Sequence, residues 1–198
     1  MPQISPGRNG DKMSKVDFKP GNMLYPLPVI MVSCADKKGN TDIVTIAWAG
    51  TVCSTPPMVS ISVRPERYSH GMIEETGEFT INLTTRELTR ATDLCGVKSG
   101  RDVNKWELTG LTPVAGTTVS CPYIQESPVN IECKVTQKLA LGSHDMYLAE
   151  VTGVHVDDKY MDEKGTFHLD QADPIAYSHG TYYSLGEVLG TFGYSVKK

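Results

Sequence analysis

The chain has no long hydrophobic run. No apolar stretch among its 198 residues approaches the roughly 20 residues that a membrane-spanning helix needs. Residues 1–15 are polar and lack the apolar core of a secretory signal peptide. We therefore expect a cytoplasmic protein that does not enter a membrane.

Cysteine pairs and an excess of positive charge are also missing. The five cysteines are odd in number and contain no CxxC pair, so the sequence indicates free thiols and no zinc or dithiol site: Cys34, Cys53, Cys95, Cys121 and Cys133. The net charge is −4, with 19 basic and 23 acidic residues mixed along the chain. This balance gives no footprint for nucleic acid or anionic lipid, so any cationic binding site must be local.

Two common groups of catalytic motifs are absent as well. The chain has no GxSxG motif and no metal-spaced histidines, which argues against a hydrolase and against a metal site. The glycines of residues 186–193, GEVLGTFG, do not follow a strand and open a helix, as a dinucleotide fingerprint requires. A nicotinamide would have to bind without a Rossmann motif.

Strand patterns dominate what the sequence does contain. Seven runs rich in β-branched and aromatic residues alternate with turn residues: 28–35, 42–50, 58–64, 78–84, 129–141, 145–156 and 175–185. Together they predict an all-β fold with minor helices, arranged as a barrel or a sandwich. We expect residues 1–20, which are polar and contain glycine and proline, to form a flexible arm, and residues 21–198 to form a single domain.

Helical patterns are scarce. Residues 69–77 predict a short helix that ends at Gly77, and residues 84–97 predict a second helix that Gly96 stops. The stretch 98–118 is polar and rich in glycine, and a loop of that length is uncommon unless it has a function.

The segment from Thr45 to His70 combines strands with a cluster of hydrogen-bond donors. A strand-like TIAWA is interrupted by TPP, since proline cannot donate to a sheet, and the alternating MVSISV follows. The next seven residues, RPERYSH, contain two guanidinium groups, a phenol, a hydroxyl and an imidazole. All of them can donate to a phosphate, such as that of a flavin. A solvated charged turn is the alternative interpretation.

Several segments in this order resemble the flavin reductase-like family, and within it the flavoredoxin branch of the FMN-binding split barrels. The segments are DIVTIAWAG, ISVRPERYSHGMIEETGEFTINL, CGVKSGRDVNKWELTGLTP, GSHDMYLAEV and YYSLGEVLGTFGYS. The resemblance covers nearly the whole chain after Leu24. It implies a Greek-key split β-barrel that forms a homodimer, with one noncovalent FMN per subunit near the dimer interface.

The resemblance implies a set of residues around the flavin ring: Asp42, Thr45, Ile46, Ala47, Trp48, Cys53, Ser54, Thr55 and Tyr177. Asp42 departs from the family's usual asparagine, and a simple turn residue is the competing interpretation. Trp48 matches an aromatic residue that the family places against the flavin, although most tryptophans in strands lie in a core. Tyr177 stands where the family usually has phenylalanine.

Further residues are implied at the phosphate and at the reactive side of the ring. Arg64 would pair with the phosphate, with Ser69 in place of the family's threonine and Tyr68 as a weaker contact. Lys105 matches a lysine directed at the cofactor, where a cation stabilises negative charge on the reduced ring, although a solvated surface lysine is the alternative. His144 matches a histidine beside the flavin or the nicotinamide path and is the expected catalytic side chain.

The resemblance implies an FMN-dependent oxidoreductase that takes a hydride from NADH or NADPH. Its electrons would pass to free flavin, to an acceptor protein or to a small oxidant. Two other functions stay open: an electron carrier that holds FMN and is reduced by a partner protein without a nicotinamide site, and a barrel that binds FMN without turnover. The absence of a catalytic triad fits an enzyme whose cofactor carries the redox chemistry.

Overall fold

The computed structural model describes residues 15–196. The expected arm over residues 1–20 therefore lies largely outside the described residues, and residues 15–20 contain no helix or strand. Within residues 15–196, no helix is long and apolar enough to cross a membrane.

The centre of the molecule is an antiparallel sheet of seven strands, in the order β3-β2-β6-β9-β10-β5-β4. Its strands are β2 (Ile30–Ala35), β3 (Thr41–Ile46), β4 (Ala49–Ser54), β5 (Pro57–Val63), β6 (Glu78–Leu83), β9 (Val129–Ala140) and β10 (Asp145–Val156). A smaller sheet joins β1 (Leu27–Pro28), β11 (Ile175–Ser178) and β12 (Thr181–Ser184), and β7 (Pro113–Val114) pairs with β8 (Tyr123–Ile124). The prediction of an all-β fold is confirmed.

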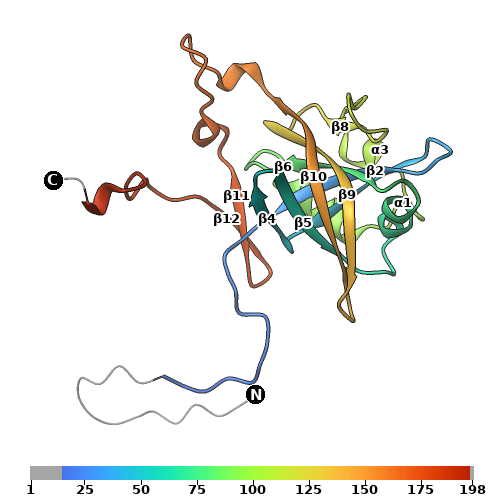
Figure 1. Cartoon of the computed structure of the whole chain (residues 1–198), viewed down its shortest axis with the longest axis horizontal. Helices are drawn as coiled ribbons and strands as arrows, with labels where there is room; N and C mark the ends of the chain where they lie inside the picture. Colours follow the sequence, from blue (N-terminus) through green and yellow to red (C-terminus); the bar gives the residue numbers. More distant parts are fainter. Residues whose placement is uncertain (1–14, 197–198) are drawn as a thin grey trace.

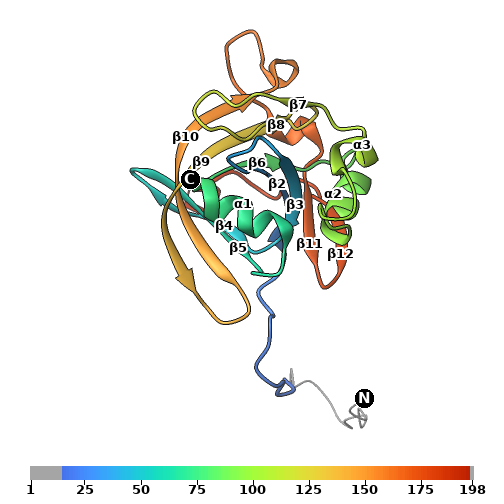
Figure 2. The ribbon, with the colours of Figure 1, turned by 90° about the vertical axis from the view of Figure 1, so that its right-hand side faces the viewer.

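The minor helices lie against this sheet. They are α1 (Tyr68–Thr76), α2 (Thr89–Val97) and α3 (Lys105–Thr109), with 3₁₀ turns at Asp158–Tyr160, Leu169–Ala172 and Tyr194–Val196. Figure 2 shows α1 in front of the curved sheet and α2 and α3 together beside β3. The helix expected to end at Gly77 is confirmed, because that residue caps α1 in the left-handed conformation.

The expected single strand over residues 42–50 is wrong. The chain bends at Ala47 and Trp48, so β3 ends at Ile46 and β4 starts at Ala49. These two strands stand at opposite ends of the strand order, and two residues alone separate them. The sheet must therefore curve until its two ends approach each other, which is the geometry of a barrel (Figure 1).

Two helical expectations also need correction. The second helix starts at Thr89 rather than near residue 84, and it continues through Gly96 because Lys98 N–H still donates to Leu94 O. The stretch 98–118 is not a plain loop, since it contains α3 and β7.

The curved sheet separates two apolar cores. Val32 and Phe79 lie inside it with Met72 and Ile73 of α1, whereas Met31 faces the other way, into a cluster with α2 and α3. Both sets are buried because neighbouring strand residues point to opposite faces and each face is covered. The five cysteines are free, as expected.

A buried carboxylate fastens the connection after α3 to the sheet. Glu132 of β9 is completely buried and accepts hydrogen bonds from the backbone and hydroxyl groups of Thr117 and Thr118 and from His155. Burial opposes ionisation, but these hydrogen bonds outweigh it and lower the pKa of Glu132 to about 2. The carboxylate therefore stays ionised in the folded protein.

Candidate functional site

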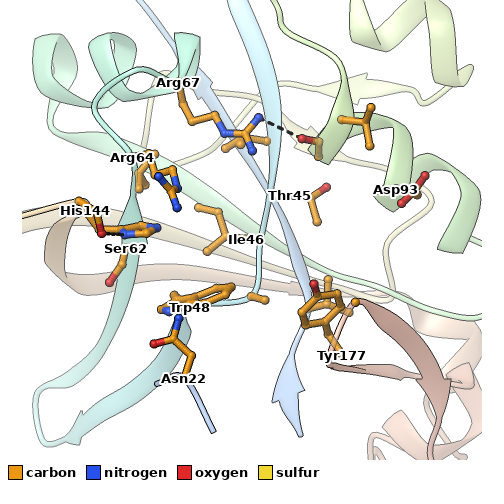
Figure 3. Close-up of a pocket in the computed structure, with 18 of the residues that line it drawn as sticks. Asn22, Thr45, Ile46, Trp48, Ser62, Arg64, Arg67, Asp93, His144 and Tyr177 are labelled. Atoms are coloured by element: carbon orange, nitrogen blue, oxygen red, sulfur yellow. Dashed lines mark hydrogen bonds between the residues drawn. The ribbon is translucent and has the colours of Figure 1, made fainter. Parts of the chain in front are cut away.

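A recess forms where β3 bends into β4. This main cavity has a volume of about 560 Å³ and is bounded by β3, β5, α2, the hairpin loop at residues 141–144 and the β11–β12 hairpin. Figure 3 shows Arg64, His144 and Trp48 on one side of the cavity and Tyr177 on another, with Thr45 and Ile46 between them.

Most of the residues expected at the flavin ring line the main cavity: Thr45, Ile46, Ala47, Trp48 and Tyr177. The structure places Trp48 at the cavity rather than in a core, because its side chain remains 40% exposed. Its indole stacks on the imidazole of His144, with ring centroids 6.0 Å apart and an interplanar angle of 15°. Thr45 Oγ1 donates to the backbone oxygen of Thr92, so this hydroxyl is already engaged.

Three of the expected ring residues lie away from the cavity. Cys53, Ser54 and Thr55 occupy the far end of β4 and the turn that follows it, and they do not line the main cavity. Ser54 and Thr55 are exposed, and Cys53 Sγ contacts Thr55 O at 3.4 Å. Their contact with a cofactor stays a prediction.

A smaller, cationic recess adjoins the main cavity. This basic cleft has a volume of about 350 Å³ and shares Val44, Arg64 and Arg67 with the main cavity. Its lining residues are Val44, Arg64, Glu66, Arg67, Tyr68, Ser69, Lys98, Ser99, Gly100, Arg101 and Lys105. The two recesses are therefore neighbours, and the second one is strongly cationic.

Two of the arginines are held by backbone oxygens. Arg67 Nη1 donates to Gly96 O at 3.0 Å, and Arg101 Nη1 donates to Glu66 O at 2.9 Å. The guanidinium group of Arg101 also lies over the ring of Tyr68, 5.5 Å from its centroid. Since a guanidinium group carries five N–H donors, each arginine keeps others for an anion.

Asp42, Ser69 and Lys105 form a buried network between the two cores. Lys105 Nζ lies 3.1 Å from Asp42 Oδ1, and Ser69 Oγ donates to Asp42 Oδ2 at 2.6 Å. Lys105 Nζ also donates to Ile43 O and Cys95 O. Asp42 is 2% exposed and Lys105 is 4% exposed, so neither is a turn residue or a solvated lysine. Their polar atoms bind one another, although Ser69 and Lys105 border the basic cleft.

His144 closes the hairpin loop between β9 and β10 and points into the main cavity (Figure 3). Its Nδ1 lies 2.9 Å from Ser143 Oγ. Partial burial lowers the pKa of His144 below its ordinary value, and the positive charge of Arg64 lowers it further, while Glu66 acts in the opposite direction. The imidazole is therefore neutral at neutral pH.

The structure adds residues that sequence reasoning did not select. Asn22 of the N-terminal segment and Asp93 of α2 line the main cavity, and Tyr182 of β12 donates to Asp93 Oδ1 at 3.1 Å. Gly96 lets α2 approach β3, because a Cβ there would lie 3.2 Å from Thr45 Cβ. A glycine inside an otherwise regular helix was the one signal for this close approach.

The chain is similar to proteins of one family. A family model for the flavin reductase like domain matches residues 22–186. An uncharacterized protein of Archaeoglobus fulgidus is 31% identical over 141 residues, which cover 71% of this chain and 78% of that protein.

Solved structures give the same assignment. The flavoredoxin of Desulfovibrio vulgaris (Miyazaki F) has 32% identity and a TM-score of 0.86, covering 93% of this chain and all of that chain (100%). A flavoredoxin from Methanosarcina acetivorans has 25% identity and a TM-score of 0.84, with coverages of 93% and 100%.

The expected split barrel is confirmed as well. A putative flavin reductase with a split barrel domain from Shewanella frigidimarina superposes with a TM-score of 0.75 at 24% identity, over 84% of this chain and 85% of that one. At this identity the likeness concerns the fold. On the family model, the relative and the flavoredoxin structures, the chain belongs to the flavin reductase-like family, in its flavoredoxin branch.

Proposed function

We propose that this protein is an FMN-dependent oxidoreductase that accepts a hydride from NADH or NADPH. Membership of the flavin reductase-like family supports a flavin-related oxidoreductase or electron-transfer protein. The observation that carries the finer proposal is the junction at Arg64 and Arg67, where an aromatic-lined cavity adjoins a cleft rich in cations.

The two recesses suit the two ends of FMN. A volume of about 560 Å³ falls within the ~300–1,000 Å³ common for small-molecule sites, and Trp48 and Tyr177 offer apolar faces to a flat ring. The basic cleft suits the phosphate, which carries about −1.5 to −2 charges at neutral pH. Arg64, Arg67 and Lys98 line this cleft without a buried carboxylate partner among the described residues.

Bound FMN would supply hydride acceptance and electron transfer, and the chain's own residues would supply binding and orientation. Arg64 and Arg67 would hold the phosphate, while Trp48 and Tyr177 would confine the ring. A neutral His144 can donate one hydrogen bond without adding charge to the cavity. The Asp42–Lys105 pair would hold β3 and the start of α3 in place, since it joins these two elements.

The half-exposed face of Trp48 supports an open approach for the nicotinamide, which has no Rossmann motif in this chain. The competing function is an electron carrier that holds FMN and is reduced by a partner protein. The similarity to a Desulfovibrio vulgaris protein named flavoredoxin supports this alternative function.

Anaerobic stopped-flow mixing separates the two functions. The purified protein would be loaded with FMN and mixed with NADH or NADPH while absorbance is followed in the flavin band. Prompt bleaching with either nucleotide is the expected result for a reductase. FMN that binds but does not bleach would support the electron carrier, and a protein that fails to bind FMN would exclude both functions.

We further propose that the protein acts as a homodimer. The segment after β12 leads away from the body of the molecule (Figure 1) and exposes large apolar side chains: Leu185, Val188, Leu189, Phe192, Tyr194 and Val196. Such a surface is typical of an interface. Light scattering after size exclusion should give twice the chain mass of 21.7 kDa, and L189E/F192E should reduce it to one chain. A monomeric parent protein would contradict this proposal.

A further inference from the structure

A histidine–aspartate contact outside the main cavity connects α1 to the start of β10, next to the hairpin loop that borders this cavity. Asp145 is the first residue of β10 and directly follows His144, and its Oδ2 lies 2.8 Å from His70 Nε2 in α1. Both side chains are largely buried, with 13% of His70 and 12% of Asp145 exposed. None of the functions considered above uses this pair.

Further contacts surround the pair and tie α1 to the β9–β10 hairpin. Lys138 Nζ of β9 lies 3.7 Å from Asp145 Oδ2 and 2.8 Å from Glu74 Oε2 of α1. Tyr147 of β10 donates to Glu74 Oε1 at 2.7 Å, and its ring meets the ring of His70 edge-on, with centroids 5.8 Å apart. Three elements are therefore joined at one place.

The geometry of the β9–β10 hairpin couples the position of His144 to this attachment. Successive side chains at a strand point to opposite sides, so Asp145 faces α1 while His144 faces the main cavity. The loop between the strands is short and closed, because Leu141 N–H donates to His144 O at 2.9 Å and Gly142 has a φ of +90°. The loop can therefore shift little while Asp145 stays attached to α1.

We propose that the His70–Asp145 pair is a clamp that positions His144 over Trp48 at the edge of the main cavity. Both residues are positioning residues, since neither lines the cavity. Loss of the clamp releases loop 141–144 from α1, so the imidazole leaves the indole and becomes hydrated. The importance of this position for catalysis rests on the proposed function, but the clamp itself does not.

The ionisation of His144 reports its position. Partial burial and Arg64 lower the pKa of His144, whereas Glu66 raises it. The charges near the clamp are those of Lys138 on β9 and Glu74 on α1. When the loop opens, His144 gains hydration and leaves Arg64, so its pKa should rise toward the ordinary value.

Two variants break the clamp with different effects on the local charge. Asp145→Asn removes a negative charge, which by itself would lower the pKa of His144. His70→Phe removes the hydrogen-bonding nitrogen, takes away no negative charge and keeps a ring against Tyr147. The pKa of His144 would be measured from histidine Cε1–H shifts by NMR, with its signal identified by its absence in His144→Gln.

We expect both variants to raise the measured pKa of His144 above that of the parent protein. His70→Gln can still donate to Asp145 and should restore most of the parent value. The matched control is His168→Phe, because His168 pairs with Asp162 at 3.1 Å and lines neither the main cavity nor the basic cleft, so this variant should leave the pKa of His144 unchanged.

Each other outcome overturns the clamp. A lowered or unchanged pKa in Asp145→Asn would mean that the pair acts through charge alone or is not coupled to His144. An equal rise in His168→Phe would indicate general loosening of the fold. If Asp145→Asn does not fold, His70→Phe together with its His70→Gln rescue decides the question. Since the titration needs no turnover, it stands even if the protein proves not to be a reductase.

Discussion

The replacement Lys105→Met tests whether this lysine serves the fold or the cofactor. The ammonium group of Lys105 is buried against Asp42 Oδ1 at 3.1 Å and donates to the backbone oxygens of Ile43 and Cys95. Methionine fills a similar volume but leaves the carboxylate of Asp42 buried, with Ser69 Oγ as its remaining hydrogen-bond donor among the contacts described above. We therefore expect the folded state to lose much of its stability.

The size of the loss follows from the burial of the pair. Breaking a buried ion pair by removing one partner costs about 3–5 kcal/mol, because the other charge stays in a place that water cannot reach. For a protein of this size, that corresponds to a fall in Tm of about 6–20 °C. The double variant Asp42→Asn with Lys105→Met leaves no buried charge, so part of this loss should be recovered.

Urea unfolding of the FMN-free protein, followed by circular dichroism, measures the effect. Lys98→Met is the matched control, since Lys98 is an exposed lysine near the same cleft and its loss should leave the midpoint unchanged. If Lys105→Met unfolds at the parent's urea concentration while its FMN affinity falls, the lysine serves the cofactor, and the structural interpretation is refuted.

Three further results are expected. Arg64→Ala should weaken FMN binding roughly tenfold or more in a fluorescence titration, because a charge-assisted hydrogen bond contributes ~1.5–3 kcal/mol, and unchanged affinity would remove Arg64 from the site. Gly100→Ala should destabilise the protein by ~1–3 kcal/mol, because its Cβ would clash with Asp42 Oδ1. Gly71→Ala in α1, where an added Cβ would meet nothing within 4 Å, should stabilise the protein by ~0.5–1 kcal/mol in the same urea assay. Burial opposes the ionisation of Glu132, but hydrogen bonds lower its pKa from 4.5 to about 2, so its stabilisation is present above pH 4.5 and is lost as the pH falls toward about 2. Glu132→Gln should flatten this acid dependence, and an equally steep loss would contradict the assignment.

Local patterns predicted the strands and α1 well. Alternating apolar residues marked β5, and Gly77 marked the end of α1, because both signals depend on neighbours in the sequence. The bend at Ala47 and Trp48 was missed for the opposite reason. The run from residue 42 to residue 50 is uniformly suited to a strand, and the break arises because β4 pairs with β5 on the other end of the sheet.

The sequence predicted which segments of the chain form the site. It did not predict which way the charged side chains of the site point. Thr45, Trp48 and His144 were expected at the cavity and lie there. Their location could be predicted because it depends on the local strand or hairpin that carries each residue. Asp42 and Lys105 were expected at the flavin, yet each uses its charge on the other across 63 residues of chain.

No local pattern could reveal that pairing, because a lysine at the first turn of a short helix is usually solvated. It becomes buried here since α3 packs on β3, where Trp106 Nε1 donates to Thr41 Oγ1 at 3.0 Å. Once α3 is held there, Lys105 must meet a carboxylate or lose its charge. Asp42 supplies that carboxylate, and its effect on a flavin bound at the site would be reduced by the cation 3.1 Å away.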